Sequence, residues 1–409
     1  MAVCLAACTK NETPVEPQEP VIMTAEENKA RLQQIGEEFL NAIPASDFKE
    51  LADLADFVVR QYCMGEDKTE PLIQYAKECF QDISDTYGGE ENEHWYYSID
   101  PFQSARKLLT VGKAYAHAKW NGQQWEVIEK DTKDIRMECP GPDGGLVQLI
   151  VTPDAEKKSN NSIELSADVV ISLDQKQLFR TQISLIMNSR TGSEFNVSRD
   201  NIQCTYTAWV AGYVFRDNRI SAKANTDDGA RVEATVLKAG RTLLSFTVKG
   251  RANIKPYSGS LEDAVETGDD FFQGYGLSSV YLNILGQLQI NGACKDLHTL
   301  MDSFDKAQDT ERDIVGRNEA LQVANEQVDV TFGYSGNFTP QGSVVMELIG
   351  HRDETSQEIV SYDIQPVFVF ADGSRYSLSD DSFFNRDNWG YIIDLFEKLR
   401  KDYEELADR

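Results

Sequence analysis

Several signatures of chemistry are missing from this sequence. Its four histidines are scattered, and it contains no GxSxG, HExxH or P-loop motif. Its seven cysteines form no CxxC pair, so neither a zinc site nor a dense disulfide framework is indicated. The sequence therefore offers no catalytic residue, and we predict no cofactor and no metal site.

Positive charge is also scarce. Lys and Arg total 40 against 67 Asp and Glu, which gives a formal net charge of −27. Such a field repels phosphate backbones, so we expect no nucleic-acid partner. No run of about eighteen apolar residues is present, and we therefore expect no membrane-spanning helix. The 409 residues suffice for two to three compact units, or for one large sheet with helical additions.

The N-terminus carries the most specific signal. A short apolar stretch ends in Leu5, Ala6, Ala7 and Cys8, which resembles the lipobox read by bacterial lipoprotein-processing enzymes. Small residues let a signal peptidase approach the backbone, and the sulfur of Cys8 would carry the diacylglycerol. Because the stretch is short and no basic residue precedes it, we expect a basic leader upstream of the given start. The alternative is an apolar N-terminus with a buried Cys8.

The residues after Cys8 favour a tether. Pro14, Pro17 and Pro20 recur every three residues, the period of polyproline II. A segment of this kind, at about 3.1 Å per residue, could hold a domain roughly 45 Å from a membrane. The tract Lys10-Asn11-Glu12 loosely resembles the charged tract that directs Bacteroidota lipoproteins to the cell surface. We therefore expect a lipid-anchored outer-membrane protein, at the cell surface or on the periplasmic face, with the lipid as its membrane attachment.

The periodicity of apolar residues predicts an α+β fold. It indicates an N-terminal helical segment, then a large and mainly antiparallel β-sheet with an inserted helical region, and a C-terminal helix. The predicted segments are a signal-peptide end at 1–8, a tether at 9–23, helices at 24–89, a β meander at 90–295, a helical region at 296–326, β hairpins at 327–387 and a final helix at 388–409.

Helix signals are clear at several points. Thr24 and Glu27 form a capping box, and Asp387 is predicted to cap the last helix. A third N-terminal helix is predicted to begin near Thr69. Spacing along these helices places Cys63 and Cys79 too far apart for a disulfide, which favours buried free thiols.

Two-residue periodicity starts near residue 110. It predicts a hairpin around Asn121-Gly122, a second with its turn at Gln175-Lys176, and a third at Asp372-Gly373. Further strands are predicted at 203–215, 219–225, 231–237, 242–249, 280–291, 328–334, 343–350 and 359–370. One face of these strands is apolar and the other mostly polar, the pattern of an antiparallel sheet with one solvated side. Residues 169–188 and 232–253 share a strand–turn–strand form, which either an internal duplication or convergent hairpin chemistry explains.

Three stretches resemble a family of uncharacterised Bacteroidota lipoproteins. They are LDQKQL at 173–178, YLNILG at 281–286, and the tail PVFVFADGSRYSLSDDSFFN followed by IIDLFEKLRKDYEELAD. The resemblance implies an exported α+β lipoprotein and brings no activity or site residues with it.

Three other patterns have a structural and a functional interpretation. Gly274-Tyr275-Gly276 is a plain loop or the start of a Gly-rich phosphate loop. Two acidic clusters, at 266–270 and 377–387, are solvated loops or oxygen-rich calcium sites, although neither has EF-hand spacing. Trp120 and Trp125, and the aromatic run at 94–97, pack across strands or stack on sugars.

These observations favour a non-catalytic binding or scaffolding module whose glycan or protein ligand the sequence does not identify. One alternative is a glycan-active hydrolase, which requires two carboxylates about 5 to 9.5 Å apart in a cleft. The other is a lipid or lipoprotein carrier, which requires an apolar cavity against the sheet.

Overall fold

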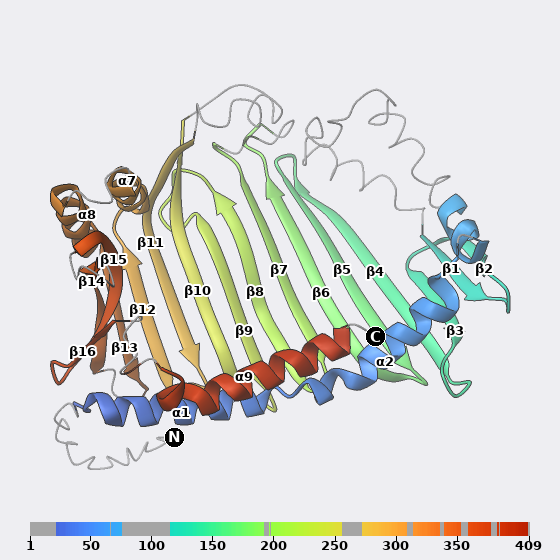
Figure 1. Cartoon of the computed structure of the whole chain (residues 1–409). Coiled ribbons are helices and arrows are strands. Elements are labelled where there is room, and N and C mark those ends of the chain that lie inside the picture. The colour runs from blue at the N-terminus through green and yellow to red at the C-terminus, as the bar shows by residue number, and fades with distance from the viewer. Residues whose placement is uncertain are drawn as a thin grey trace, which may run out of the picture.

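A computed structural model confirms the α+β fold. It describes residues 22–65, 67–75, 115–191, 196, 198–255, 272–308, 314–335, 339–352, 359–377, 383 and 385–407. Within these residues, helices precede one sheet of 16 strands and a long helix follows it. Figure 1 shows α1, α2 and α9 lying across one end of the strands, while α7 and α8 lie near the other end.

The strands are long and follow one another closely along the chain. They are β1 Tyr115–Trp120, β2 Trp125–Thr132, β3 Ile135–Pro140, β4 Leu146–Ser159, β5 Ser162–Leu173, β6 Lys176–Asn188, β7 Asn201–Val210, β8 Tyr213–Lys223, β9 Ala230–Lys238, β10 Arg241–Ile254, β11 Phe272–Ile284, β12 Leu288–Cys294, β13 Val328–Tyr334, β14 Pro340–Arg352, β15 Ile359–Phe370 and β16 Arg375–Ser377.

Strand order in space follows strand order in the chain. From β16 back to β3 each strand pairs with its sequence neighbour, and β1 and β2 complete the order β3-β1-β2. Among the described pairings, only that of β1 with β3 is parallel. The predicted antiparallel meander is therefore confirmed over most of the sheet.

Four tight turns lie at the same end of the sheet. In each turn both central residues have positive φ, which is the backbone conformation of the two-residue hairpin turns whose twist matches that of the flanking strands. They are Asp174-Gln175, Ala211-Gly212, Ala239-Gly240 and Leu285-Gly286. The predicted turn at Gln175-Lys176 was thus one residue too late. The strands predicted at 203–215 and 280–291 were also wrong, because a turn divides each of them into two strands.

The helices are α1 Ala25–Ala42, α2 Lys49–Val58, α7 Leu297–Gln308, α8 Ile314–Gln327 and α9 Arg386–Ala407, with shorter helical turns at Ala45–Phe48 and Val59–Cys63. The capping box of Thr24 and Glu27 is present at the start of α1. Residues 67–75 are helical, as expected, and the rest of the third predicted helix lies outside the described residues. In the part of the chain that the structure describes, no helix is long and apolar enough to cross a membrane.

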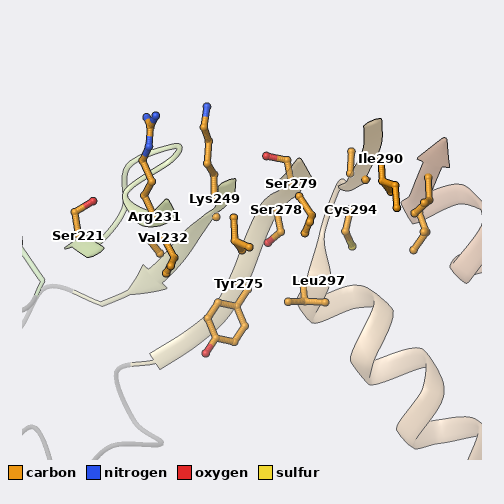
Figure 2. A pocket seen from close by; sticks show the side chains of 18 residues that line it. Ser221, Arg231, Val232, Lys249, Tyr275, Ser278, Ser279, Ile290, Cys294 and Leu297 are labelled. Atoms are coloured by element: carbon orange, nitrogen blue, oxygen red, sulfur yellow. The ribbon is translucent and has the colours of Figure 1, made fainter. Parts of the chain in front are cut away.

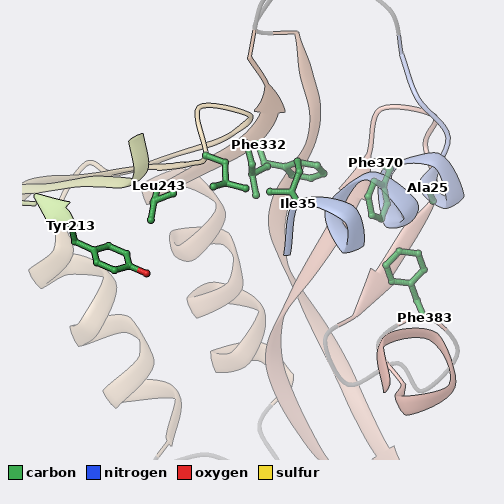
Figure 3. Close-up of a cluster of buried hydrophobic side chains, with 9 residues drawn as sticks. Ala25, Ile35, Tyr213, Leu243, Phe332, Phe370 and Phe383 are labelled. Carbon is green, nitrogen blue, oxygen red and sulfur yellow. The ribbon is translucent and has the colours of Figure 1, made fainter. Parts of the chain in front are cut away.

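The main core lies between α1 and the turn end of the sheet. Ile35 of α1 is 1% exposed and packs in a cluster with sheet residues such as Leu243 and Phe332. Figure 3 shows Ala25 and Ile35 among Phe332, Phe370 and Phe383, where the sheet bends around α1. The helix α9 lies against α1 and has no buried residue of its own.

A second hydrophobic core lies near the edge of the sheet that β1 and β2 form. Trp125 is 2% exposed, and its Nε1 donates a hydrogen bond of 3.0 Å to the carbonyl oxygen of Tyr62. The ring of Trp120 lies 6.1 Å from that of Trp125. The packing interpretation of these two tryptophans is therefore correct, and they are not arranged as an exposed sugar platform.

Two local predictions were wrong. The amide oxygen of Asn385 accepts a hydrogen bond of 2.7 Å from the backbone N–H of Asn388, so Asn385 caps α9, whereas Asp387 lies within its first turn. Cys63 has a free thiol, as predicted, but it is exposed because it lies at the end of its helical turn.

Candidate functional site

Pairing register places a continuous row of apolar residues on one face of the sheet. Residues that pair directly across neighbouring strands point to the same face. Such pairs link Leu165, Leu185, Cys204, Ile220, Val232, Val248, Val280, Gly292, Val330, Val344 and Phe368, from β5 to β15. This is the face that packs on α1. Val236, Ile290 and Phe332 lie two or four residues along the same strands from members of the row, so they point to the same face, and all three pack in the main core.

The neighbouring row points to the opposite face and is polar. It links Ser166, Ser184, Thr205, Arg219, Glu233, Thr247 and Tyr281 through the same pairings. The prediction of one apolar and one polar face is therefore confirmed.

The helices cover the apolar face only in part. The end of the sheet opposite the four tight turns is called the loop end here. Toward that end, Val232, Val248 and Val280 remain 37%, 39% and 46% exposed on three adjacent strands. They line a hollow of about 620 Å³, which also reaches Ile290 at the edge of the α1 core. The lining consists of Ser221, Ala230, Arg231, Val232, Val248, Lys249, Gly250, Tyr275, Ser278, Ser279, Val280, Ile290, Gly292, Ala293, Cys294, Leu297, Val328 and Val330.

The hollow presents little charge to its interior. Figure 2 shows the side chains of Arg231 and Lys249 pointing away from the side on which Val232, Tyr275 and Leu297 lie. Burial raises the pKa of the Cys294 thiol, which keeps it protonated near neutral pH. The interior is therefore apolar and chemically unreactive.

Helix α7 forms the wall of the hollow at the loop end, through Leu297. It packs unusually closely on β11, since a Cβ at Gly274 would lie 2.6 Å from Cγ of His298. Gly274 also has a φ of +101°, which glycine adopts without strain. Gly274-Tyr275-Gly276 thus belongs to strand β11, so both loop interpretations of this motif were wrong.

A second hollow, of about 570 Å³, lies on the polar side and includes Asp154 and Asp168. Both oxygens of Asp168 accept hydrogen bonds from Arg180, at 3.0 and 2.7 Å. These hydrogen bonds lower the pKa of the Asp168 carboxyl group. The general acid of a glycoside hydrolase requires a raised pKa, so Asp168 is unsuited to that role.

The described histidines do not form a metal centre. His117 contacts two carboxylates through opposite ring nitrogens, with Glu129 at 2.9 Å from Nδ1 and Asp134 at 2.8 Å from Nε2. No group of three or more His, Cys, Asp or Glu in the described part of the chain could hold a metal ion.

Several predicted site residues lie outside the described residues. They are Cys8 and its signal-peptidase motif Leu5, Ala6 and Ala7, together with Cys79, the aromatic run at 94–97, and the acidic residues 266–270, Asp380 and Asp381. The sequence raised an apolar cavity against the sheet only as an alternative, and it did not locate the hollow or identify its lining. The one sequence signal of the hollow is that Gly250 and Gly292 occur at alternating strand positions that are otherwise mainly apolar.

Comparison with known proteins returned no match, whether to protein-family models, to curated proteins or to solved structures.

Proposed function

We propose that this protein is an exported lipoprotein, anchored through Cys8, that acts by binding an acyl chain in the hollow of its apolar face. The observation that carries the proposal is the partial exposure of Val232, Val248 and Val280 around a hollow of about 620 Å³. That volume falls within the range of about 300 to 1,000 Å³ that is typical of small-molecule sites.

The energetics favour an apolar ligand. Burial of apolar surface contributes roughly 25 cal/mol per Å², and each buried methylene about 0.8 kcal/mol. A hydrocarbon chain in the hollow would bury its own surface and the exposed parts of the three valines together. The side chains of Arg231 and Lys249 point away from this interior, so a charged group placed there would lose its hydration without gaining a partner.

Binding can be tested with a fluorescent linear fatty acid, displaced by palmitate. The substitution Val280→Glu places a carboxylate in the hollow and is expected to weaken binding by about tenfold or more. Asn291→Glu is the matched control, because Asn291 pairs with Tyr281 of the polar row and does not line the hollow. Absence of binding to the wild-type chain, or equal losses in both variants, would count against the proposal.

The anchor requires a separate experiment. The chain, expressed in a bacterial host behind a complete lipoprotein leader, is expected to incorporate radiolabelled palmitate and to fractionate with the outer membrane. Cys8→Ala should abolish labelling, while Cys4→Ala, which changes a cysteine outside the lipobox, should leave it intact. Equal labelling of the wild type and Cys8→Ala would contradict lipid attachment at Cys8. Membership of a Bacteroidota lipoprotein family is a further part of this proposal.

A further inference from the structure

The floor of the hollow is made mostly of small side chains. Ala230, Gly250, Ser278, Cys294 and Val328 pair directly with one another across five adjacent strands, β9 to β13. On the side toward α1 this row is bordered by the row of Val232, Val248, Val280, Gly292 and Val330. On the loop side Tyr275 and Leu297 lie on the same side of the strands as Val232, opposite Arg231 and Lys249 (Figure 2). The hollow is thus a trough whose long axis crosses the strands.

The dimensions of the trough follow from sheet geometry. Five adjacent strands at spacings of about 4.8 Å give it a length of roughly 19 Å. Across its width, the trough extends only from the row that contains Val232, Val248 and Val280, called the valine row here, to Leu297 of α7. It is therefore long and narrow.

At two positions in the trough, the backbone conformation does not require the glycine that occupies them. Neither Gly250 nor Gly292 has a positive φ. A Cβ at Gly292 would make ordinary contacts, at 3.6 Å from Val330 and 3.8 Å from Val280. A Cβ at Gly250 would lie 3.1 Å from Oγ of Ser278, the end of a side chain that can rotate. Glycine weakens a strand interior, so its presence at two positions that accept a side chain indicates that the space above them is used.

We infer that the ligand is a single unbranched hydrocarbon chain lying at right angles to the strands, and that Gly250 and Gly292 determine which ligands fit. This inference rests on the proposed function. An extended chain follows the trough across β9 to β13 and contacts the valine row along one edge. A fused-ring sterol or a methyl-branched chain is wider and meets the α7 wall at Tyr275 and Leu297.

The test compares Gly292→Val and Gly250→Val with the wild type, using the same fluorescent fatty acid. Valine suits a strand, so both variants are expected to fold, which far-ultraviolet circular dichroism and the unfolding midpoint will check. Each should weaken binding by about tenfold. Thr331→Val is the control, because Thr331 pairs with Asn291, which pairs with Tyr281 of the polar row, and it does not line the hollow, so its affinity should equal that of the wild type.

The outcomes separate this inference from the proposed function. Failure of the wild-type chain to bind any fatty acid would overturn both. Wild-type binding that the two glycine variants leave unchanged would overturn only the placement of the chain. Displacement of the probe by cholesterol as effectively as by palmitate would overturn the restriction to a single unbranched chain.

Discussion

Nζ of Lys238 lies 2.6 Å from Oδ2 of Asp47, although 190 residues separate them in the chain. The same ammonium donates to the carbonyl oxygen of Ala42 at 3.0 Å, the last residue of α1. Carbonyls at a helix C-terminus lack intrahelical partners and favour a nearby cation. Lys238 therefore joins the end of α1 to strand β9 and holds the helix against the sheet.

Removing this link is expected to destabilise the fold. Lys238→Met keeps most of the apolar stem but removes the cation that donates to Asp47 and to the Ala42 carbonyl, which leaves the Tyr213 hydroxyl as a donor to both oxygens. A loss of about 2 kcal/mol in the free energy of unfolding is expected. Lys176→Met is the control, because its ion pair with Glu50 is more than half exposed on both sides and contributes less than about 1 kcal/mol. Urea unfolding measures both, and similar losses would contradict the structural role of Lys238.

Alkaline pH should destabilise the fold through Tyr213. Burial, with the neighbouring Asp47 carboxylate, raises the pKa of the Tyr213 hydroxyl to about 12. In the unfolded chain its pKa is about 10. Because the folded value is raised, the stabilisation is complete below about pH 10 and is lost as pH rises toward 12.

Tyr213→Phe tests this assignment. The variant should be less stable at neutral pH, because it loses the hydroxyl's contacts with Asp47 and Ala42. Its stability should fall less steeply between about pH 10 and 12 than that of the wild type. An unchanged slope in Tyr213→Phe would show that another group titrates on unfolding.

The contact between β11 and α7 predicts an unequal cost for two glycine substitutions. Gly122 and Gly274 have φ values of +103° and +101°, but a Cβ at Gly122 would meet nothing within 4 Å. Gly122→Ala should therefore cost about 1 kcal/mol, from backbone strain alone. Gly274→Ala adds the clash with His298 and should cost more. Because Cβ of His298 would also lie within 2.8 Å, His298→Gly, which removes it, should relieve the excess in the double variant, and strict additivity in thermal unfolding would argue against a direct clash.

The cap of α9 provides a fourth test. Asn385→Ala should destabilise the protein by about 1 kcal/mol, since it leaves the N–H of Asn388 without its side-chain acceptor. Asp387→Ala should cost about 0.5 kcal/mol, from the loss of a charge in the first helical turn. Thermal melts of the two variants compare them directly, and a larger cost for Asp387→Ala would restore it as the cap.

Features that depend on residues close in the chain could be predicted. The capping box of Thr24 and Glu27 involves residues three apart, and β13 and β15 have the bounds that alternation predicted. The turns at Ala211 and Leu285 were missed because alanine and leucine rarely adopt positive φ, and only the pairing of the flanking strands imposes it there.

Features that depend on distant residues could not be predicted. Alternation indicated an apolar face, but not how much of it the helices would cover. That coverage depends on where α1 docks, which Lys238, Tyr213 and Asp47 determine across more than 160 residues of sequence. The trough is the part of the face that this docking leaves open.

Because nearly every strand pairs with its neighbour in the chain, the sheet has a low contact order over most of its length. Hairpins closed by two-residue turns can form early and then add to one another in sequence, without waiting for distant segments. An unfolded chain could thus assemble its sheet progressively from one hairpin to the next. The helix α1 docks across strands from β8 to β15, so its final packing would follow the completion of those strands and close the folding reaction.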